Sequence, residues 1–227
     1  MNTEVIKKEL ISKGTYTYDD LVAIMRILRG KDGCPWDMEQ TQKSIRNNLL
    51  EEAYEAVEGI DNSDPKIMRE ELGDLLLQIV FHSVIAEENN EFTDTEVITE
   101  ICEKLIIRHP HIFADTQVSG TGDVLKNWDK IKYETKGMKS AADIMGGVSG
   151  ALPALVRAQK LKKRSEKLKS AGGTSEIVFS EEEKAMGEIG KRLFDLAAEA
   201  RAMGIDAEEA LELYNKAFLK ANSEKSL

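Results

Sequence analysis

The chain has 227 residues, a formal net charge of −10, 41% apolar residues and 32% charged residues. This length allows one large domain or two small ones, and the apolar fraction is sufficient for a hydrophobic core. The acidic balance argues against a nucleic-acid-binding protein, which normally carries a basic excess. It does not exclude a nucleotide enzyme, because a bound metal ion reverses the local field.

Composition and cysteine content narrow the class further. Only four prolines occur, and the abundance of Ala, Leu, Glu and Lys favours an all-α fold. Two cysteines, Cys34 and Cys102, are too few for a disulfide framework. The first residues lack the apolar core of a signal peptide, and the most apolar run, 75–86, is too short to span a membrane. We therefore expect a soluble cytoplasmic protein that does not contact membranes.

The first third of the chain contains two predicted helices and a loop of unusual composition. Helices are expected over 3–13 and 18–30, the second with apolar residues at helical spacing. Glycine and proline make 33–44 a loop, which contains Trp36. Trp36 is either a packing anchor or a wall of a nucleotide pocket. In the second case, hydrogen bonds to base or sugar would come from Gln40, Thr41 or Ser44.

Two pairs of acidic residues dominate the next stretch. Glu52 and Glu55 are three residues apart, as are Glu71 and Asp74, so each pair shares one face of a helix. Between the pairs, the segment Gly-Ile-Asp-Asn-Ser-Asp-Pro at 59–65 ends one helix and starts another, with proline suited to the first turn. The sequence therefore predicts two antiparallel helices, over 42–60 and 65–88.

The two acidic pairs are expected to meet at one height of this hairpin. With Asn62 as the bend, their centres lie about 8.5 residues before it and about 10.5 after it, a mismatch on the order of 3 Å. Four carboxylates so placed repel one another unless a hard divalent cation, Mg²⁺ above all, binds them. Mg²⁺ commonly binds substrate phosphates too, which suggests a phosphate ester or anhydride substrate. The alternative is a solvated acidic helix face.

Basic and aromatic residues follow the hairpin. A helix over 93–108 begins with a capping box and ends with Lys104 and Arg108, which are four residues apart. These two cations either complement the helix dipole or face the carboxylates and hold a polyphosphate. His109 and His111 cap, pack or bind, and their role is open.

A further helix over 127–134 places Trp128 and Lys132 four residues apart. A tryptophan can stack on a base, and a lysine one turn later can reach a phosphate. The alternative is an amphipathic helix with an interface tryptophan.

Three motifs together resemble the MazG family of all-α nucleoside triphosphate pyrophosphohydrolases. They are Glu-Glu-x-x-Glu at 51–55 with Glu-x-x-Asp at 71–74, Cys-Pro-Trp-Asp at 34–37, and Lys-Leu-Ile-Ile-Arg-His-Pro-His at 104–111. The resemblance implies a helical bundle completed by dimerisation, which cleaves nucleoside triphosphates between the α and β phosphates. It also implies broad specificity and a role in removing aberrant nucleotides.

The resemblance also implies roles for individual residues. Mg²⁺ would be bound by Glu52, Glu55, Glu71 and Asp74. Glu51, Glu52 and Glu55 would be the catalytic residues. Glu51 would either orient the attacking water or only be solvated. Lys104, Arg108 and Lys132 would neutralise the departing pyrophosphate, and Trp128 would contact the nucleotide. The partners would be nucleoside triphosphates and a second copy of the chain.

The second half looks like a degenerate copy of the first. Residues 137–150 are rich in Gly, Ser and Ala, so we predict a catalytic unit over 1–137, a linker over 138–149 and a degenerate MazG-like unit over 150–227. Residues 187–194 align with 70–77, and Lys191 stands where Asp74 does. A lysine repels Mg²⁺, so catalysis is expected in the first unit and a structural, regulatory or oligomer-forming role in the second.

Other functions remain alternatives. A di-iron carboxylate bundle would need Glu-x-x-His motifs, which the paired acids lack. A regulatory protein could bind Mg²⁺ and a nucleotide or alarmone without turnover. In a pure scaffold protein, substitution of an acidic residue would change nothing.

Overall fold

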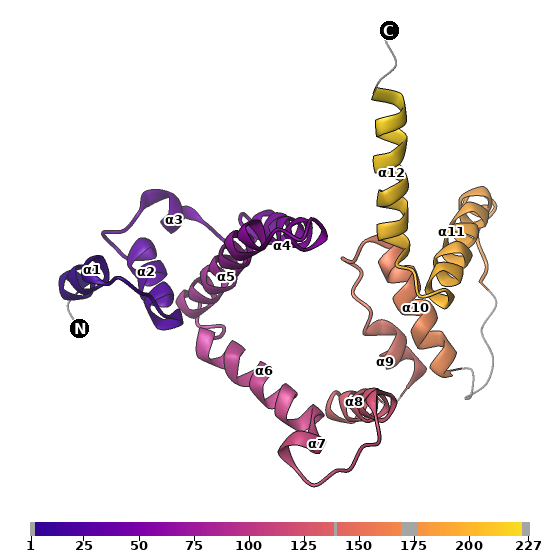
Figure 1. Ribbon diagram of the computed structural model, residues 1–227, viewed down its shortest axis with the longest axis horizontal. Helices are drawn as coiled ribbons and strands as arrows, with labels where there is room; N and C mark the ends of the chain where they lie inside the picture. The colour runs from indigo at the N-terminus through magenta and orange to yellow at the C-terminus, as the bar shows by residue number, and fades with distance from the viewer. Residues whose placement is uncertain (1–2, 139, 169–176, 224–227) are drawn as a thin grey trace. The chain divides into compact units, whose positions relative to one another are not determined.

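The computed structural model describes residues 3–138, 140–168 and 177–223, and all regular structure there is helical (Figure 1). The predicted all-α class is therefore confirmed. The chain divides into two compact units, Met1–Thr116 and Gln117–Leu227, each described by itself below. Among the described residues, no helix combines the length and apolarity that a membrane crossing requires.

The first unit is organised around a long helical hairpin (Figure 1). Its helices are α1 (Thr3–Ser12), α2 (Tyr18–Arg29), α3 (Pro35–Glu39), α4 (Arg46–Asp61), α5 (Pro65–Glu88), α6 (Asp94–Arg108) and α7 (Pro110–Phe113). Helices α4 and α5 form the hairpin, and α2 packs on the second half of α5. The buried core comes from α2, α5 and the residue before α4, namely Val22, Met25, Ile45, Val80, Phe81, Val84 and Ile85.

The turn of the hairpin follows from its sequence. The Asp64 side chain caps α5 by accepting hydrogen bonds from the backbone N–H groups of Lys66 (2.9 Å) and Ile67 (3.2 Å). Helix α4 continues two residues past Gly59, to Asp61. A Cβ at Gly59 would lie 2.8 Å from the Met68 backbone nitrogen, so the glycine allows the two helices to approach closely. This contact helps to fix the register of the hairpin.

The predicted loop before α4 contains the short helix α3. The chain reverses sharply after α2, where the Cys34 N–H donates to the Leu28 carbonyl (2.7 Å). Gly33 is required at this reversal, because a Cβ would lie 2.1 Å from the Leu28 carbonyl oxygen. The loop then returns towards the second half of α5, where the Trp36 and Phe81 ring centroids are 6.4 Å apart.

Helix α6 begins with the predicted capping box. The Thr93 hydroxyl accepts from the Glu96 N–H, and the Glu96 carboxylate accepts from the Thr93 N–H (2.7 Å). Arg26 on α2 fixes this end of the helix by pairing with Glu87 (2.8 Å) and Asp94 (3.2 Å). An apolar face of α6 stays exposed, formed by Val97, Ile98, Ile101 and Leu105, and Ile106 and Ile107 are exposed further round the helix.

The second unit contains α8 (Thr121–Thr135), α9 (Ala141–Gly146), α10 (Ala154–Leu168), α11 (Lys184–Ala202) and α12 (Ala207–Ser223). Its small core gathers Ala158, Ala197 and Ala207 from α10, α11 and α12. Helix α8 begins six residues before the predicted start at 127, and α9 occupies part of the predicted linker. The contacts divide the chain at Thr116, and the functional boundary at the linker 138–149 stays a prediction.

Candidate metal centre

The two arms of the hairpin bring three carboxylates together. Glu52 and Glu55 lie one turn apart on α4, and Glu71 lies on α5. One carboxylate oxygen from each falls within 4.8 Å of the other two. The expected match in height is therefore found for these three residues, and hydrogen-bonded caps and a close glycine contact hold the helices that carry them.

Asp74 lies outside this group of three but influences it. Burial raises the pKa of Glu52, and the negative charges of Asp74, Glu55 and Glu51 raise it further. The pKa of Glu71 is also raised, first by burial and then by the charge of Glu55 and a hydrogen bond to it, with Asp74 contributing less. The four acidic residues therefore form one electrostatic cluster, beside which Glu51 is exposed.

The cluster has the chemistry of a site for a hard cation. Within the described parts of the chain, no lysine or arginine forms an ion pair with Glu52, Glu55, Glu71 or Asp74. Its donors are all oxygen atoms, which Mg²⁺ prefers. Burial is the first cause of the two raised pKa values and repulsion among the carboxylates is the second. A divalent cation would relieve this repulsion, so the residues present fit such an ion.

The predicted phosphate-binding cations, Lys104 and Arg108, lie in the second half of α6. The Lys104 ammonium pairs with Glu100 one turn earlier on the same helix (2.8 Å). Arg108 is the last residue of α6 and is partly buried. Helix α6 packs on α5 and α7. That Lys104 and Arg108 face the carboxylates therefore stays a prediction.

The predicted nucleotide-contacting pair lies on α8 in the second unit. Lys132 Nζ is 4.7 Å from the centroid of the Trp128 ring, a cation–π arrangement. The two side chains are thus brought together as the spacing predicted. His109 Nδ1 contacts the Leu105 carbonyl (2.6 Å), and its ring lies 5.6 Å from that of His111, as in a packed helix end.

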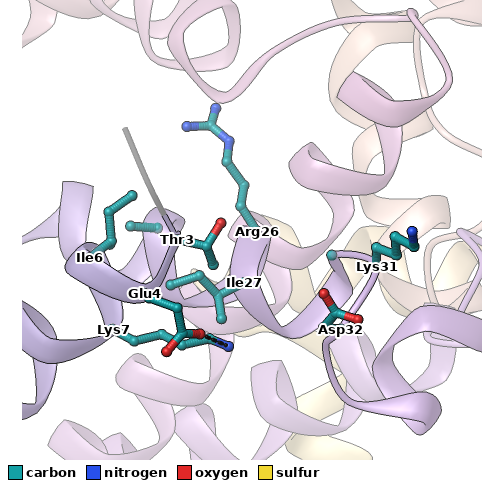
Figure 2. A pocket seen from close by; sticks show the side chains of 10 residues that line it. Thr3, Glu4, Ile6, Lys7, Arg26, Ile27, Lys31 and Asp32 are labelled. Atoms are coloured by element: carbon teal, nitrogen blue, oxygen red, sulfur yellow. Dashed lines mark hydrogen bonds and ion pairs between the residues drawn. The ribbon is translucent and has the colours of Figure 1, made fainter.

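One hollow of the first unit lies away from the carboxylates. It has a volume of about 520 Å³ and lies between α1 and α2 (Figure 2). Several of its charged groups are already paired: Lys7 with Glu4 (3.1 Å), and Arg26 with residues of α5 and α6. Because no acidic residue of the hairpin lines it, the chemistry rather than the hollow identifies the candidate site.

Sequence reasoning missed one buried cation near the hairpin. Only 6% of the Arg29 side chain is exposed, and it forms an ion pair with Glu88 (2.6 Å). Its position in the last turn of α2 resembles an ordinary complement to the helix dipole. In the sequence, the one sign of a special role for Arg29 was its position next to Gly30, just before the predicted loop over 33–44.

Comparison with known proteins places the chain in a family. Residues 40–113, which include the whole hairpin and α6, match the model of the MazG nucleotide pyrophosphohydrolase domain. The chain is 36% identical over 216 residues to "Nucleoside triphosphate pyrophosphohydrolase/pyrophosphatase MazG" of Thermotoga maritima, covering 89% of this chain and 83% of that protein.

Two other relatives show the extent of the similarity. "Nucleoside triphosphate pyrophosphohydrolase" of Escherichia coli is 36% identical over 219 residues, covering 88% of this chain and 83% of the relative. The "Uncharacterized protein YabN" of Bacillus subtilis is 46% identical over 141 residues, 62% of this chain but only 29% of that protein. With the acidic hairpin inside the matched domain and the similarity extending over most of two relatives, this chain belongs to the MazG family.

Proposed function

We propose that the chain is a Mg²⁺-dependent nucleoside triphosphate pyrophosphohydrolase, which converts an NTP or dNTP and water to the monophosphate and diphosphate. The observation that carries this proposal is the unneutralised cluster of Glu52, Glu55 and Glu71 inside the matched MazG domain. The names of the Thermotoga maritima and Escherichia coli relatives support the same reaction.

The residues of the cluster and its neighbour Glu51 would have separate roles in metal binding and in orienting water. Glu52, Glu55 and Glu71 would hold the cation, and Asp74 would complete the donor set. When bound, Mg²⁺ acts as a Lewis acid towards the phosphoryl oxygens. Exposed Glu51 would orient the attacking water.

The substrate contacts come from α6 and α8. Lys104, Arg108 and Lys132 would stabilise the negative charge that develops on the departing diphosphate, and Trp128 would contact the nucleotide. Lys132 already lies over the Trp128 ring, so one contact to the base and one to a phosphate would arise from adjacent turns of α8.

A second copy of the chain would complete the site. The apolar face of α6 is exposed, and α5 adds exposed Leu72, Leu76 and Ile79; exposed apolar surface of this kind is typical of protein–protein contacts. Packing of these faces in a homodimer, or a higher oligomer, would cover them. It would also allow Lys104 of one copy to approach the carboxylates of the other.

Catalysis is assigned to the first unit. Among the described residues, the one group of three or more possible metal-binding side chains is the hairpin cluster. In the second unit Lys191, which aligns with Asp74, pairs with Asp195 on its own helix (2.5 Å). We assign residues 150–227 to structure, regulation or oligomer contacts, and the enzyme to nucleotide-pool housecleaning with broad specificity.

Phosphorus NMR tests the proposal. The purified chain is incubated with Mg²⁺ and a panel of NTPs and dNTPs, beside Glu52→Gln and the matched control Glu58→Gln, an exposed acid on the same helix. Monophosphate and diphosphate should accumulate with the wild type and the control, and not with Glu52→Gln.

Other outcomes would change the assignment. Orthophosphate with a nucleoside diphosphate would mean that a different bond is cleaved. Metal-dependent nucleotide binding without turnover would make the chain a regulatory binding protein. Equal turnover by Glu52→Gln and wild type would remove the hairpin cluster from the mechanism.

A further inference from the structure

Arg29 joins three separate parts of the first unit. Its Nε and Nη2 donate to the two carboxylate oxygens of Glu88 at the end of α5 (2.9 and 2.6 Å). Its Nη1 donates to the carbonyl oxygens of Asp37 and Gln40 (3.2 Å to Gln40), one within α3 and the other just after it. Burying an arginine is costly unless its charge and donors are satisfied, as they are here.

The segment that Arg29 holds carries Trp36. The backbone carbonyl of Trp36 accepts a hydrogen bond from Gln40 Nε2 (2.8 Å), and Gln40 Oε1 accepts one from the Ser44 hydroxyl (2.8 Å). The main chain around the tryptophan is therefore tied to α2 by Arg29 and tied to itself by Gln40.

The tryptophan side chain is nevertheless open to solvent. Its ring meets Phe81 edge to face, with an interplanar angle of 65°, and the residue is 56% exposed. The Arg29 guanidinium lies 5.4 Å from the centroid of the same Phe81 ring. A tryptophan that served only as a packing anchor would be mostly buried. Here a well-fixed backbone presents an exposed aromatic surface.

The Phe81 ring that Trp36 meets lies on the same helix, α5, as Glu71 and Asp74. Asp74 and Phe81 are seven residues apart on α5, which places them on the same face, two turns or about 10 Å apart. A nucleotide whose phosphates lie at the carboxylates therefore has its base within reach of the level of Phe81 and Trp36.

We propose that Trp36 is a stacking surface for the base of the nucleotide, and that Arg29 is the positioning residue that holds it in place. This inference rests on the proposed function, since it assumes that the phosphates bind at the hairpin carboxylates. Stacking on an aromatic ring tolerates every base, because each base has a π-face. Such a subsite would give affinity without selecting one base.

Fluorine NMR tests the stacking directly. The chain contains two tryptophans, so labelling with 5-fluorotryptophan gives two signals, which Trp36→Phe assigns. The probes are an α,β-imido nucleoside triphosphate with Mg²⁺, in which the proposed bond is not cleaved, and inorganic tripolyphosphate, which has no base. The Trp36 signal should shift with the nucleotide analogue and not with tripolyphosphate. Trp36→Ala should weaken binding of the analogue by about 5- to 150-fold.

A matched pair of variants tests the role of Arg29. Lysine cannot pair with Glu88 through two donors and also reach two carbonyl oxygens. Arg29→Lys should therefore weaken binding of the analogue and leave tripolyphosphate binding unchanged. Arg26 lies on the same helix and pairs with Glu87 of α5 and Asp94 of α6 rather than with the Trp36 segment, so Arg26→Lys should change neither. Equal weakening of both probes by Arg29→Lys would mean general structural support and would overturn the positioning role.

The remaining outcomes separate this inference from the proposed reaction. If the Trp36 signal is unmoved and Trp36→Ala binds the analogue as tightly as wild type, the stacking surface is refuted, whether or not diphosphate is released in the phosphorus assay. A shifted Trp36 signal without diphosphate release would refute the hydrolysis and keep the stacking surface. A signal that responds to protein concentration and not to nucleotide would assign Trp36 to a contact between copies, which also overturns the inference.

Discussion

An alanine at position 59 tests how closely the hairpin is packed. Its Cβ would lie 2.8 Å from the Met68 nitrogen and 3.0 Å from the Met68 Cα, backbone atoms that cannot rotate away. Alanine is favoured over glycine in a helix by about 1 kcal/mol, whereas overpacking costs about 1–3 kcal/mol. We therefore expect Gly59→Ala to be less stable than wild type by about 1 kcal/mol, and at most about 2 kcal/mol.

The neighbouring helix provides a control of opposite sign. No atom lies within 4 Å of a Cβ built at Gly73 of α5, so Gly73→Ala should gain about 0.5–1 kcal/mol from helix propensity alone. Urea denaturation of the metal-free proteins, followed by circular dichroism, measures both changes. Because Glu55 and Glu71 lie one turn from the Gly59 contact, Gly59→Ala should also weaken Mg²⁺ binding in a calorimetric titration. A Gly59→Ala chain more stable than wild type would show that the helices do not approach as described.

Two further predictions concern the same hairpin. Because the pKa of Glu71 is raised in the folded chain, its ionised form destabilises the metal-free protein, and this loss disappears as the pH falls towards its usual pKa of 4.5. At pH 7 in EDTA, Glu71→Gln should therefore have a higher melting temperature than wild type. This difference should shrink towards pH 4.5, and at pH 7 with Mg²⁺ the wild type should have the higher melting temperature. A difference in melting temperature that stays constant under all three conditions would contradict this. Asp64→Ala should lose about 0.5–2 kcal/mol with its N-cap, whereas Asp64→Asn should keep most of the stability, as measured in urea.

The features that sequence reasoning predicted depend on neighbouring residues. The Asp64 cap, the Thr93 capping box and the pairing of acidic residues three apart follow from helical geometry within one or two turns. The meeting of Glu52 with Glu71 needed only the helix rise and the position of the bend. The geometry of a helical hairpin therefore allows contacts to be predicted between residues about twenty positions apart.

The features that sequence reasoning missed depend on contacts between distant segments. Propensity describes Gly59 as a helix breaker, and only the packing of Met68 shows that it is a contact point. Arg29 pairs with Glu88, which is 59 residues away in the sequence, and no local sequence pattern predicts this contact. Lys104 is a different case: its pairing with Glu100 is an ordinary spacing of four residues and could have been predicted.

The proposal that a second copy of the chain contributes to the carboxylate site rests on the local pairing of three lysines. Lys104 pairs with Glu100, Lys132 lies over Trp128, and Lys191 pairs with Asp195, each within its own helix. A bound metal ion offsets part of the charge of the carboxylates, but a triphosphate adds more negative charge to the same place. We propose that a second copy of the chain supplies part of the balancing positive charge, and α6, which carries exposed apolar residues, is the element that we expect to supply it.

Mixing two inactive variants distinguishes a shared site from a site within one chain. If Lys104 acts on the partner's hairpin, a mixed dimer of Glu52→Gln and Lys104→Gln contains one site with both defects and one site with neither. Random mixing after reversible dissociation should then restore activity at about a quarter of all sites, since half of the dimers are mixed and each has one intact site. If Lys104 acts within its own chain, every site keeps one defect and mixing restores nothing. Mixing each variant with itself is the control, and the absence of recovery in dimers shown to have exchanged would place Lys104 outside the partner's site.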